Sequence, residues 1–157
     1  ILGFYFAEFD RIIKRHGIEK IKTIGDSYMC VSGLPIPSDD HAERMVNAAI
    51  EIRDFVKEQM EIGKREGKPY FAIRIGLNSG SVVAGVVGIK KFAYDIWGDA
   101  VNLASRMESS CEIWRINISR NTKELLGDNF ELEHRGMIEI KNMQKMDMYY
   151  VKTPNDL

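Results

Sequence analysis

The segment from Lys20 to Met29 constrains the fold more than any other part of this chain. Its sequence, KIKTIGDSYM, places two largely apolar stretches on either side of a Gly-Asp pair. Glycine readily adopts the positive φ angles of tight turns, so we expect the chain to reverse at Gly25 and form a β-hairpin. The reversal leaves the carboxylate of Asp26 at the tip, where it can reach a metal ion. An ordinary hairpin with a polar turn explains the same pattern, so other segments must decide between the two interpretations.

The composition indicates one folded domain. The chain has 157 residues, of which 45% are hydrophobic and 29% charged, which is enough to bury a core. A net charge of −1 argues against a nucleic-acid partner. No apolar run approaches the ~20 residues that span a bilayer, and there is no signal-peptide pattern. Cys30 and Cys111 have no metal-binding spacing, and we expect them to be free thiols of a cytoplasmic domain.

The pattern along the chain predicts an α/β domain in which helices and strands alternate. We expect helices near 4–15, 40–62, 98–110 and 120–126, and strands near 18–24, 27–34, 71–78, 115–118, 130–140 and 147–152. The glycine-punctuated residues 81–88 are expected to form a further hairpin. Some successive strands look hairpin-linked, so an α/β sandwich with a mixed or mainly antiparallel sheet fits best. Because the chain opens directly in a helix, we expect a domain that lacks its beginning.

A second polar pattern lies between Tyr94 and Met107. On a helix, Asn102 and Arg106 are four residues apart and share one face, and Asp99 lies three residues before Asn102. A solvated helix face, with Asp99 near the favourable N-terminus, accounts for this pattern. An amide and a guanidinium on one face can equally hold the ribose and phosphate oxygens of a nucleotide.

Together these segments resemble the catalytic domain of class III nucleotidyl cyclases, the adenylyl and guanylyl cyclase family. The resemblance runs in order over nearly the whole chain, through KIKTIGDSYM at 20–29, GLP at 33–35, IRIGL at 73–77, VVAGVVG at 82–88 and YDIWGDAVNLASRM at 94–107. Within the family, the chain is most similar to bacterial-type homodimeric adenylyl cyclases. The resemblance implies a ferredoxin-like α+β sandwich, with a mixed or antiparallel sheet flanked by helices. Residues 1–157 would then form a single catalytic domain that lacks its N-terminal strand.

The resemblance implies that Lys22 and Asp95 contact the purine base of the substrate. Their hydrogen-bonding chemistry suits adenine, which presents an acceptor at N1 and a donor at its 6-amino group. Lys22 offers only donors and an ionised Asp95 only acceptors, whereas guanine presents the reverse pattern. In this family a glutamate at the Lys22 position would suggest GTP. We therefore expect ATP as the substrate, with 3′,5′-cyclic AMP and pyrophosphate as products.

The same resemblance implies roles for the remaining site residues. Asn102 and Arg106 match the residues that contact the ribose and stabilise the transition state. Lys90 lies where a basic residue often contacts the triphosphate. Asp26 matches the second of two aspartates that hold two metal ions, Mg²⁺ or Mn²⁺.

The chain departs from the family pattern in two places that affect the site. The other metal-binding aspartate of the family belongs to an N-terminal strand that precedes the helix at 4–15, so we expect these 157 residues to be inactive alone. The late triphosphate-binding lysine of the family aligns near Met143. Lys141 and Lys145 lie two residues to either side of it, and the sequence does not decide between them.

The family's active site forms between two catalytic domains, and this chain carries residues of both sides. It has the metal-binding Asp26 as well as Asn102 and Arg106, so we expect a head-to-tail homodimer with two equivalent sites. The main alternative is a non-catalytic ATP-binding regulatory domain, which the missing aspartate favours and the retained polar residues oppose. A guanylyl cyclase is a weaker alternative because of Lys22, and a purely structural dimerisation module needs none of these residues. An upstream sensor or membrane domain is compatible with the sequence.

Overall fold

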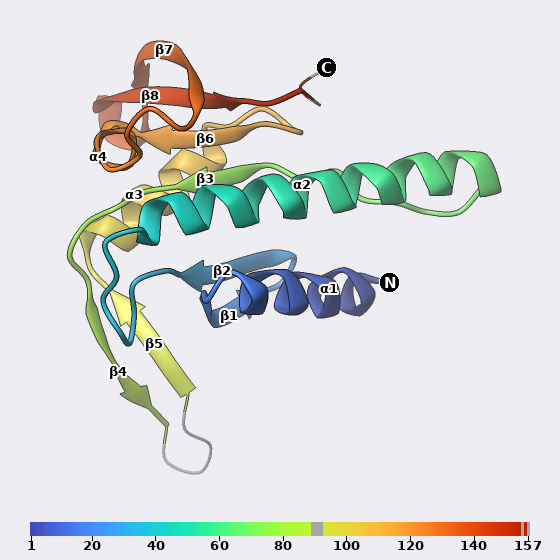
Figure 1. Ribbon diagram of the computed structural model, residues 1–157, viewed down its shortest axis with the longest axis horizontal. Helices are drawn as coiled ribbons and strands as arrows, with labels where there is room; N and C mark the ends of the chain where they lie inside the picture. Colours follow the sequence, from blue (N-terminus) through green and yellow to red (C-terminus); the bar gives the residue numbers. More distant parts are fainter. Residues whose placement is uncertain (89–92, 155, 157) are drawn as a thin grey trace.

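The computed structural model describes residues 1–88, 93–154 and 156 (Figure 1). Its elements are α1 (Leu2–Arg15), β1 (Glu19–Ile24), β2 (Ser27–Val31), α2 (His41–Glu66), β3 (Ile75–Leu77), β4 (Val83–Val87), β5 (Ala93–Trp97), α3 (Asp99–Ser109), β6 (Ile116–Ser119), α4 (Arg120–Glu124), β7 (Glu131–Glu139), the 3-10 turn η1 (Lys141–Met143) and β8 (Lys145–Lys152). Within these ranges, no helix combines the length and hydrophobicity needed to cross a bilayer. The mixture of helices and strands confirms the predicted fold class.

The described strands form three sheets. β1 and β2 form an antiparallel hairpin, and β4 and β5 form another. The four-stranded sheet has the order β3-β6-β8-β7, in which β3 and β6 are parallel and the other pairs antiparallel. Figure 1 shows this sheet on one side of α2 and the β1–β2 hairpin with α1 on the other, while β4 and β5 project as an arm. This mixed arrangement agrees with the expectation from the sequence.

The amphipathic pattern of α1 places one of its faces in the core. Tyr5, Phe9, Ile12 and Ile13 recur at helical spacing, and they are buried in a cluster that includes Ile52 of α2. Burying each large apolar side chain contributes about 1.5–3 kcal/mol, so this cluster fixes α1 against α2. A second cluster lies between the other face of α2 and the four-stranded sheet.

Several elements differ from those expected in extent or pairing. The strand expected at 27–34 ends at Val31. α2 continues through Gly63 and ends before Gly67, whose φ of 65° is the left-handed conformation that glycine adopts easily. The strand expected at 71–78 is confined to Ile75–Leu77. The prediction of a separate hairpin at 81–88 was wrong, because this segment contains the single strand β4. Its partner is β5, in a register that pairs Val83 with Trp97, and the sequence pattern did not indicate a strand there.

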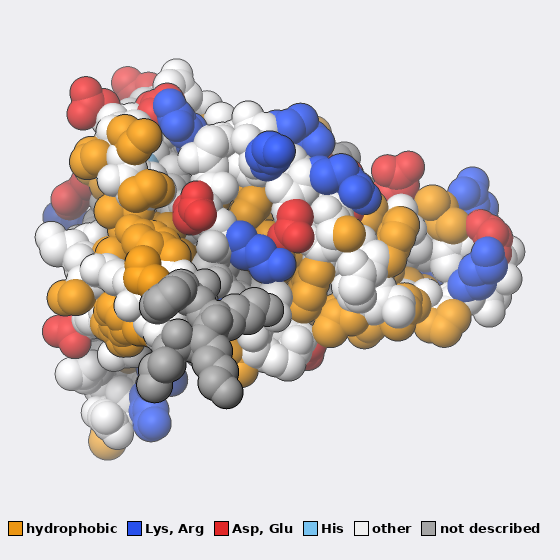
Figure 2. Space-filling view, turned by 90° about the horizontal axis from the view of Figure 1, so that it is seen from below, with side chains coloured by type: hydrophobic (Ala, Val, Ile, Leu, Met, Phe, Trp, Pro, Cys, Tyr) orange, Lys and Arg blue, Asp and Glu red, His pale blue; other side chains and the backbone are white. Residues whose placement is uncertain are grey.

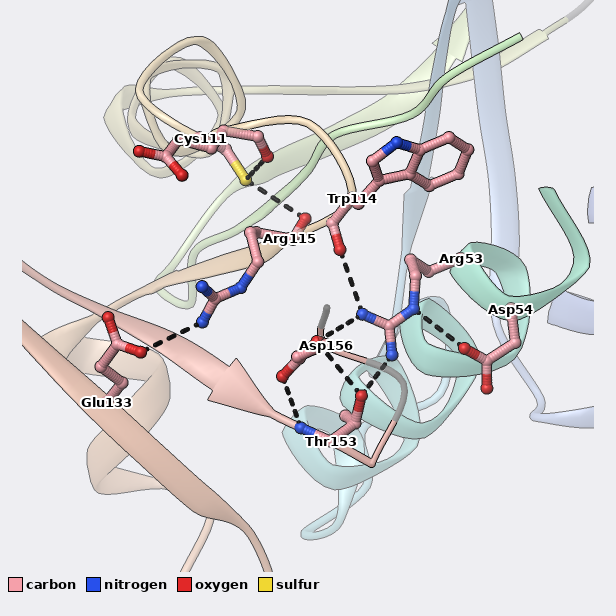
Figure 3. A network of polar contacts seen from close by, with 9 residues as sticks. Arg53, Asp54, Cys111, Trp114, Arg115, Glu133, Thr153 and Asp156 are labelled. Carbon is pink, nitrogen blue, oxygen red and sulfur yellow. Dashed lines mark hydrogen bonds and ion pairs between the residues drawn. The ribbon is translucent and has the colours of Figure 1, made fainter. Parts of the chain in front are cut away.

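A completely buried arginine joins α2 to the C-terminal segment (Figure 3). Arg53 donates to Asp156 at 2.7 Å, to Asp54 at 2.9 Å and to the carbonyl oxygen of Trp114 at 3.1 Å, and it also bonds Thr153. A buried guanidinium is tolerated only when its donors are satisfied, and here two carboxylates, a hydroxyl and a carbonyl satisfy them. The network therefore ties the chain after β8 to the centre of α2.

Both cysteines are free, as the sequence predicted. Burial raises the pKa of the Cys30 thiol to about 12 and that of the Cys111 thiol to about 11. Both side chains are therefore neutral at physiological pH and act as small apolar groups.

Candidate functional site

The predicted base-contacting pair comes together from two hairpins. Lys22 lies on β1 and Asp95 at the centre of β5, and the Lys22 ammonium donates to the Asp95 carboxylate at 2.9 Å. The other Asp95 oxygen accepts the backbone N–H of Ile96 at 2.8 Å. The hydrogen bonds from Lys22 and Ile96 hold the pKa of Asp95 below its usual value. Asp95 is therefore an ionised acceptor beside a cationic donor.

This pair remains accessible to a ligand. The side chain of Lys22 is 42% exposed and that of Asp95 is 15% exposed. The ammonium has three N–H donors and the carboxylate about four lone-pair sites, so their mutual hydrogen bond leaves both groups able to bind a further partner. The pair presents a donor next to an acceptor at the surface.

α3 presents the second predicted pair, Asn102 and Arg106, to a cavity of about 370 Å³. Gly98 is the single residue between β5 and α3. Its φ of 123° is an angle that residues with a side chain rarely adopt, and it lets the chain pass directly from the strand into the helix. The opposite wall of the cavity comes from the loop between β7 and β8. The cavity is lined by Asp99, Asn102, Leu103, Arg106, Ile140, Lys141, Asn142 and Gln144. Within the described part of the chain, the Arg106 side chain makes no hydrogen bond or ion pair, so its guanidinium can bind an anion.

The loop opposite α3 adds a lysine that the sequence left undecided. Lys141 lines the cavity on the wall opposite Arg106, whereas Met143 is 81% exposed and Lys145 begins β8. Asn142 and Met143 have φ angles of 67° and 61°, so the loop turns sharply directly after Lys141. Spacing alone did not distinguish the two lysines, because this turn decides which of them lines the cavity.

The predicted metal ligand stands apart from this cavity. Asp26 is exposed in the turn between β1 and β2, and it forms no hydrogen bond or ion pair with any residue that the structure describes. The described residues also contain no cluster of three or more His, Cys, Asp or Glu side chains suited to a metal. Mg²⁺ binds through one or two carboxylates together with substrate phosphates, so Asp26 fits one ligand position of such a site. Lys90 lies outside the described residues.

Comparison with known proteins decides the family. Residues 1–153 match the sequence profile of the adenylate and guanylate cyclase catalytic domain. The chain belongs to this family. The cyclase family was predicted from the two polar segments, and the match confirms it.

The relatives of this cyclase domain include enzymes named for either nucleotide. An adenylate cyclase of Mycobacterium tuberculosis is 42% identical over 146 residues, which are 93% of this chain and 32% of the relative. The chain thus spans about a third of that relative's length. The guanylate cyclase domain of RhGC from Catenaria anguillulae, solved with GTP, is 38% identical with a TM-score of 0.86, and the match covers 97% of this chain and 81% of that one. The adenylyl cyclase CyaB from P. aeruginosa is 30% identical with a TM-score of 0.88, covering 99% and 83%. These likenesses confirm the cyclase fold and leave the nucleotide open.

The arm formed by β4 and β5 carries hydrophobic side chains that are exposed to solvent and not buried in the core. We define the arm patch as Val83, Val86 and Val87 of β4 with Trp97 of β5. Val83 is 66% exposed and Val86 is 64% exposed. Figure 2, which views the molecule from the side where the arm projects, shows hydrophobic side chains gathered next to it. Side chains alternate between the two faces of a strand, so Val83, Val87 and Trp97 lie on one face of the hairpin and Val86 on the other. Exposed apolar side chains on both faces of a projecting hairpin are typical of an interaction site.

Proposed function

We propose that this chain is the catalytic domain of an adenylyl cyclase, which converts ATP to 3′,5′-cyclic AMP and pyrophosphate. The observation that carries the proposal is the contact of 2.9 Å between Lys22 and Asp95. An ammonium donor matches N1 of adenine, and an ionised carboxylate matches its 6-amino group. Guanine would turn its N1–H toward the ammonium and its O6 toward the carboxylate, leaving both pairs mismatched. Sites built on such polar contacts discriminate strongly against a substrate that cannot form them.

The cavity beside α3 supports the chemical part of the proposal. In the reaction, the ribose 3′-oxygen forms a bond to the α-phosphorus, the bond from that phosphorus to the bridging oxygen breaks, and the 3′-hydroxyl proton passes to solvent. Arg106 donates hydrogen bonds to the phosphoryl oxygens as their charge grows, and Asn102 orients the ribose. Lys141 holds the triphosphate from the opposite wall. Ions of Mg²⁺ or Mn²⁺ held in part by Asp26 would lower the pKa of the 3′-hydroxyl and neutralise the triphosphate.

We propose that a second copy of the chain completes the site. Asp26 lies in the β1–β2 turn and is not among the described residues that line the cavity beside α3, so one copy does not place the metal ligand in that cavity. The arm patch offers the apolar surface for association. In a head-to-tail homodimer, Asp26 of one copy would serve the cavity of the other, and two equivalent sites would form.

We further propose that a strand outside these residues supplies another carboxylate. Within the described ranges, β2 pairs only with β1 and β3 pairs only with β6, so each strand has one edge open to another strand. Both strands pack on the same hydrophobic cluster, to which β2 contributes Tyr28 and Cys30 and β3 contributes Ile75. A strand between them would extend that core and continue the sheet. This agrees with the N-terminal metal-binding strand that the family resemblance implies.

The test is a product assay on protein that carries its native flanking sequence. The protein is incubated with ATP or GTP and with Mg²⁺ or Mn²⁺, and the cyclic products are separated by chromatography. We expect cyclic AMP, and we expect the Arg106→Ala variant purified in parallel to form it about 10²–10³-fold more slowly, which excludes a contaminating cyclase. Cyclic GMP as the main product would overturn the base assignment. ATP binding without either product would identify a non-catalytic regulatory domain.

A further inference from the structure

Buried polar side chains are concentrated on β6 and α4, beside the helix that carries Asn102 and Arg106. Four polar residues are almost completely buried in the described part of the chain, and Arg53 belongs to the C-terminal network of Figure 3. The other three are Asn117, Ser119 and Thr122. Burying such groups is costly unless each is hydrogen-bonded, so their partners indicate what they hold in place.

Asn117 holds the C-terminal end of α3. The last carbonyl groups of a helix lack partners within the helix, and the Asn117 amide nitrogen donates to the carbonyl oxygen of Met107 at 2.9 Å. Its amide oxygen accepts from Arg135 at 3.0 Å, and Arg135 also donates to the carbonyl oxygen of Ser110 at 3.0 Å. The held residue Met107 directly follows Arg106.

Asn78 repeats this arrangement at the other end of α3. Its amide nitrogen donates to the carbonyl oxygen of Ala100 at 3.0 Å, and its amide oxygen accepts from Ser119 at 2.7 Å. Ala100 precedes Asn102 by two residues. In both asparagines a donor on the amide oxygen fixes the orientation of the amide, so that its nitrogen points to the helix.

The backbone of α3 also lies directly against β3. A Cβ atom added to Gly76 would be 2.0 Å from the backbone nitrogen of Glu108, a distance that no side chain tolerates. The helix therefore contacts the strand through backbone atoms, and the two amides fix its position along that contact. Asn102 and Arg106 lie between the two held carbonyl groups.

We propose that Asn78 and Asn117 are positioning residues that set the place of Asn102 and Arg106 in the cavity. This inference rests on the proposed cyclase function, because it concerns how the chain presents those two side chains to the substrate. Displacing a catalytic group by about 1 Å costs up to roughly 10²-fold in rate. Asn78 and Asn117 thus act on catalysis through α3, without touching the substrate.

The first test compares Asn117→Leu with Thr122→Val in protein with its native flanking sequence. Leucine keeps the approximate size of asparagine but removes the hydrogen bond to Met107. We expect kcat to fall about 10–100-fold while KM for ATP changes less than about threefold. Thr122 is equally buried but has no hydrogen bond to α3, so Thr122→Val should lower the thermal midpoint and leave kcat unchanged. Equal kcat values for the two variants would overturn the proposal.

A double-mutant cycle separates positioning from general stability. If Asn117 acts through Arg106, Asn117→Leu should change kcat by less than about twofold in an Arg106→Ala background. An equal loss in both backgrounds would contradict the proposal. Amide hydrogen exchange supplies a readout that does not depend on activity, because exchange at the C-terminal turn of α3 should be faster in Asn117→Leu than in Thr122→Val. A wild-type protein that makes no cyclic nucleotide would defeat the proposed function, whereas unchanged exchange in Asn117→Leu would defeat this inference.

Discussion

Exchanging the hydrogen-bonding character of the Lys22–Asp95 pair should exchange the substrate. The variant combines Lys22→Glu with Asp95→Asn, which replaces the donor by an acceptor and supplies an amide donor at the acceptor position. The new carboxylate matches the N1–H of guanine, and the new amide N–H matches its O6. The combination is needed because Lys22→Glu alone would place two carboxylates side by side, which raises the pKa of Asp95.

The size of the expected change in kcat/KM depends on how far the Lys22–Asp95 pair is exposed to solvent. Fully buried polar contacts discriminate between substrates by ~10⁴–10⁵-fold. The Lys22 side chain is 42% exposed, so solvent reduces the contribution of its contact to the discrimination between ATP and GTP. We expect each mismatched contact to cost about 10–30-fold, and the two together about 10²–10³-fold in kcat/KM for ATP. kcat/KM for GTP should rise correspondingly, so that the double variant prefers GTP to ATP.

The assay measures cyclic AMP and cyclic GMP formed from each nucleotide over a range of concentrations. Lys20→Glu is the matched control, because it makes the same charge change two residues earlier on β1, where Lys20 contacts Asp10 at 3.2 Å. It should leave the substrate preference unchanged. A double variant that still prefers ATP, or a control that shifts the preference equally, would refute the base-contact argument.

Three other changes test separate parts of the structure. Arg106→Ala should lower kcat by about 10²–10³-fold with little change in ATP binding, and equal losses in steady-state kcat and in equilibrium affinity would remove its transition-state role. Val86→Glu in the arm patch should abolish the dimer that analytical ultracentrifugation detects. Met137→Glu, at a similarly exposed position on β7, should leave the dimer intact. Dissociation of the dimer in both variants, or in neither, would argue against the arm as the interface. Arg53→Met should lower the free energy of unfolding in urea by about 3–5 kcal/mol, because it leaves Asp156 without its buried cation, and a loss below about 1 kcal/mol would contradict this account of the network.

The local parts of the fold could be predicted from the sequence because local patterns determine them. The apolar spacing of α1 and the Gly25–Asp26 turn correspond to the observed helix and hairpin. The approach of Lys22 to Asp95 was foreseen through family resemblance, since no local pattern links residues on separate hairpins. The assigned roles of these residues remain predictions.

Other features depend on contacts between distant segments. β4 pairs with β5 although Gly85 in the middle of β4 suggested a turn there, because strand pairing outweighed the local preference. Arg53 lies among charged residues of α2 and has the pattern of a surface residue until its partner Asp156 is placed beside it. Asn117 looks like an ordinary strand residue, and its bond to Met107 depends on how α3 packs on the sheet. None of these contacts has a signal in sequence spacing.

Mixing two inactive variants tests whether two copies of this chain together complete a cyclase site. Asp26→Ala and Arg106→Ala proteins, each with native flanking sequence, are purified, mixed in equal amounts and allowed to exchange subunits before cyclic AMP is measured. A mixed dimer has one intact site and forms half of the dimers at full exchange, so we expect recovery of roughly a quarter of wild-type activity. Failure to recover activity, after exchange has been verified with labelled subunits, would contradict the shared site.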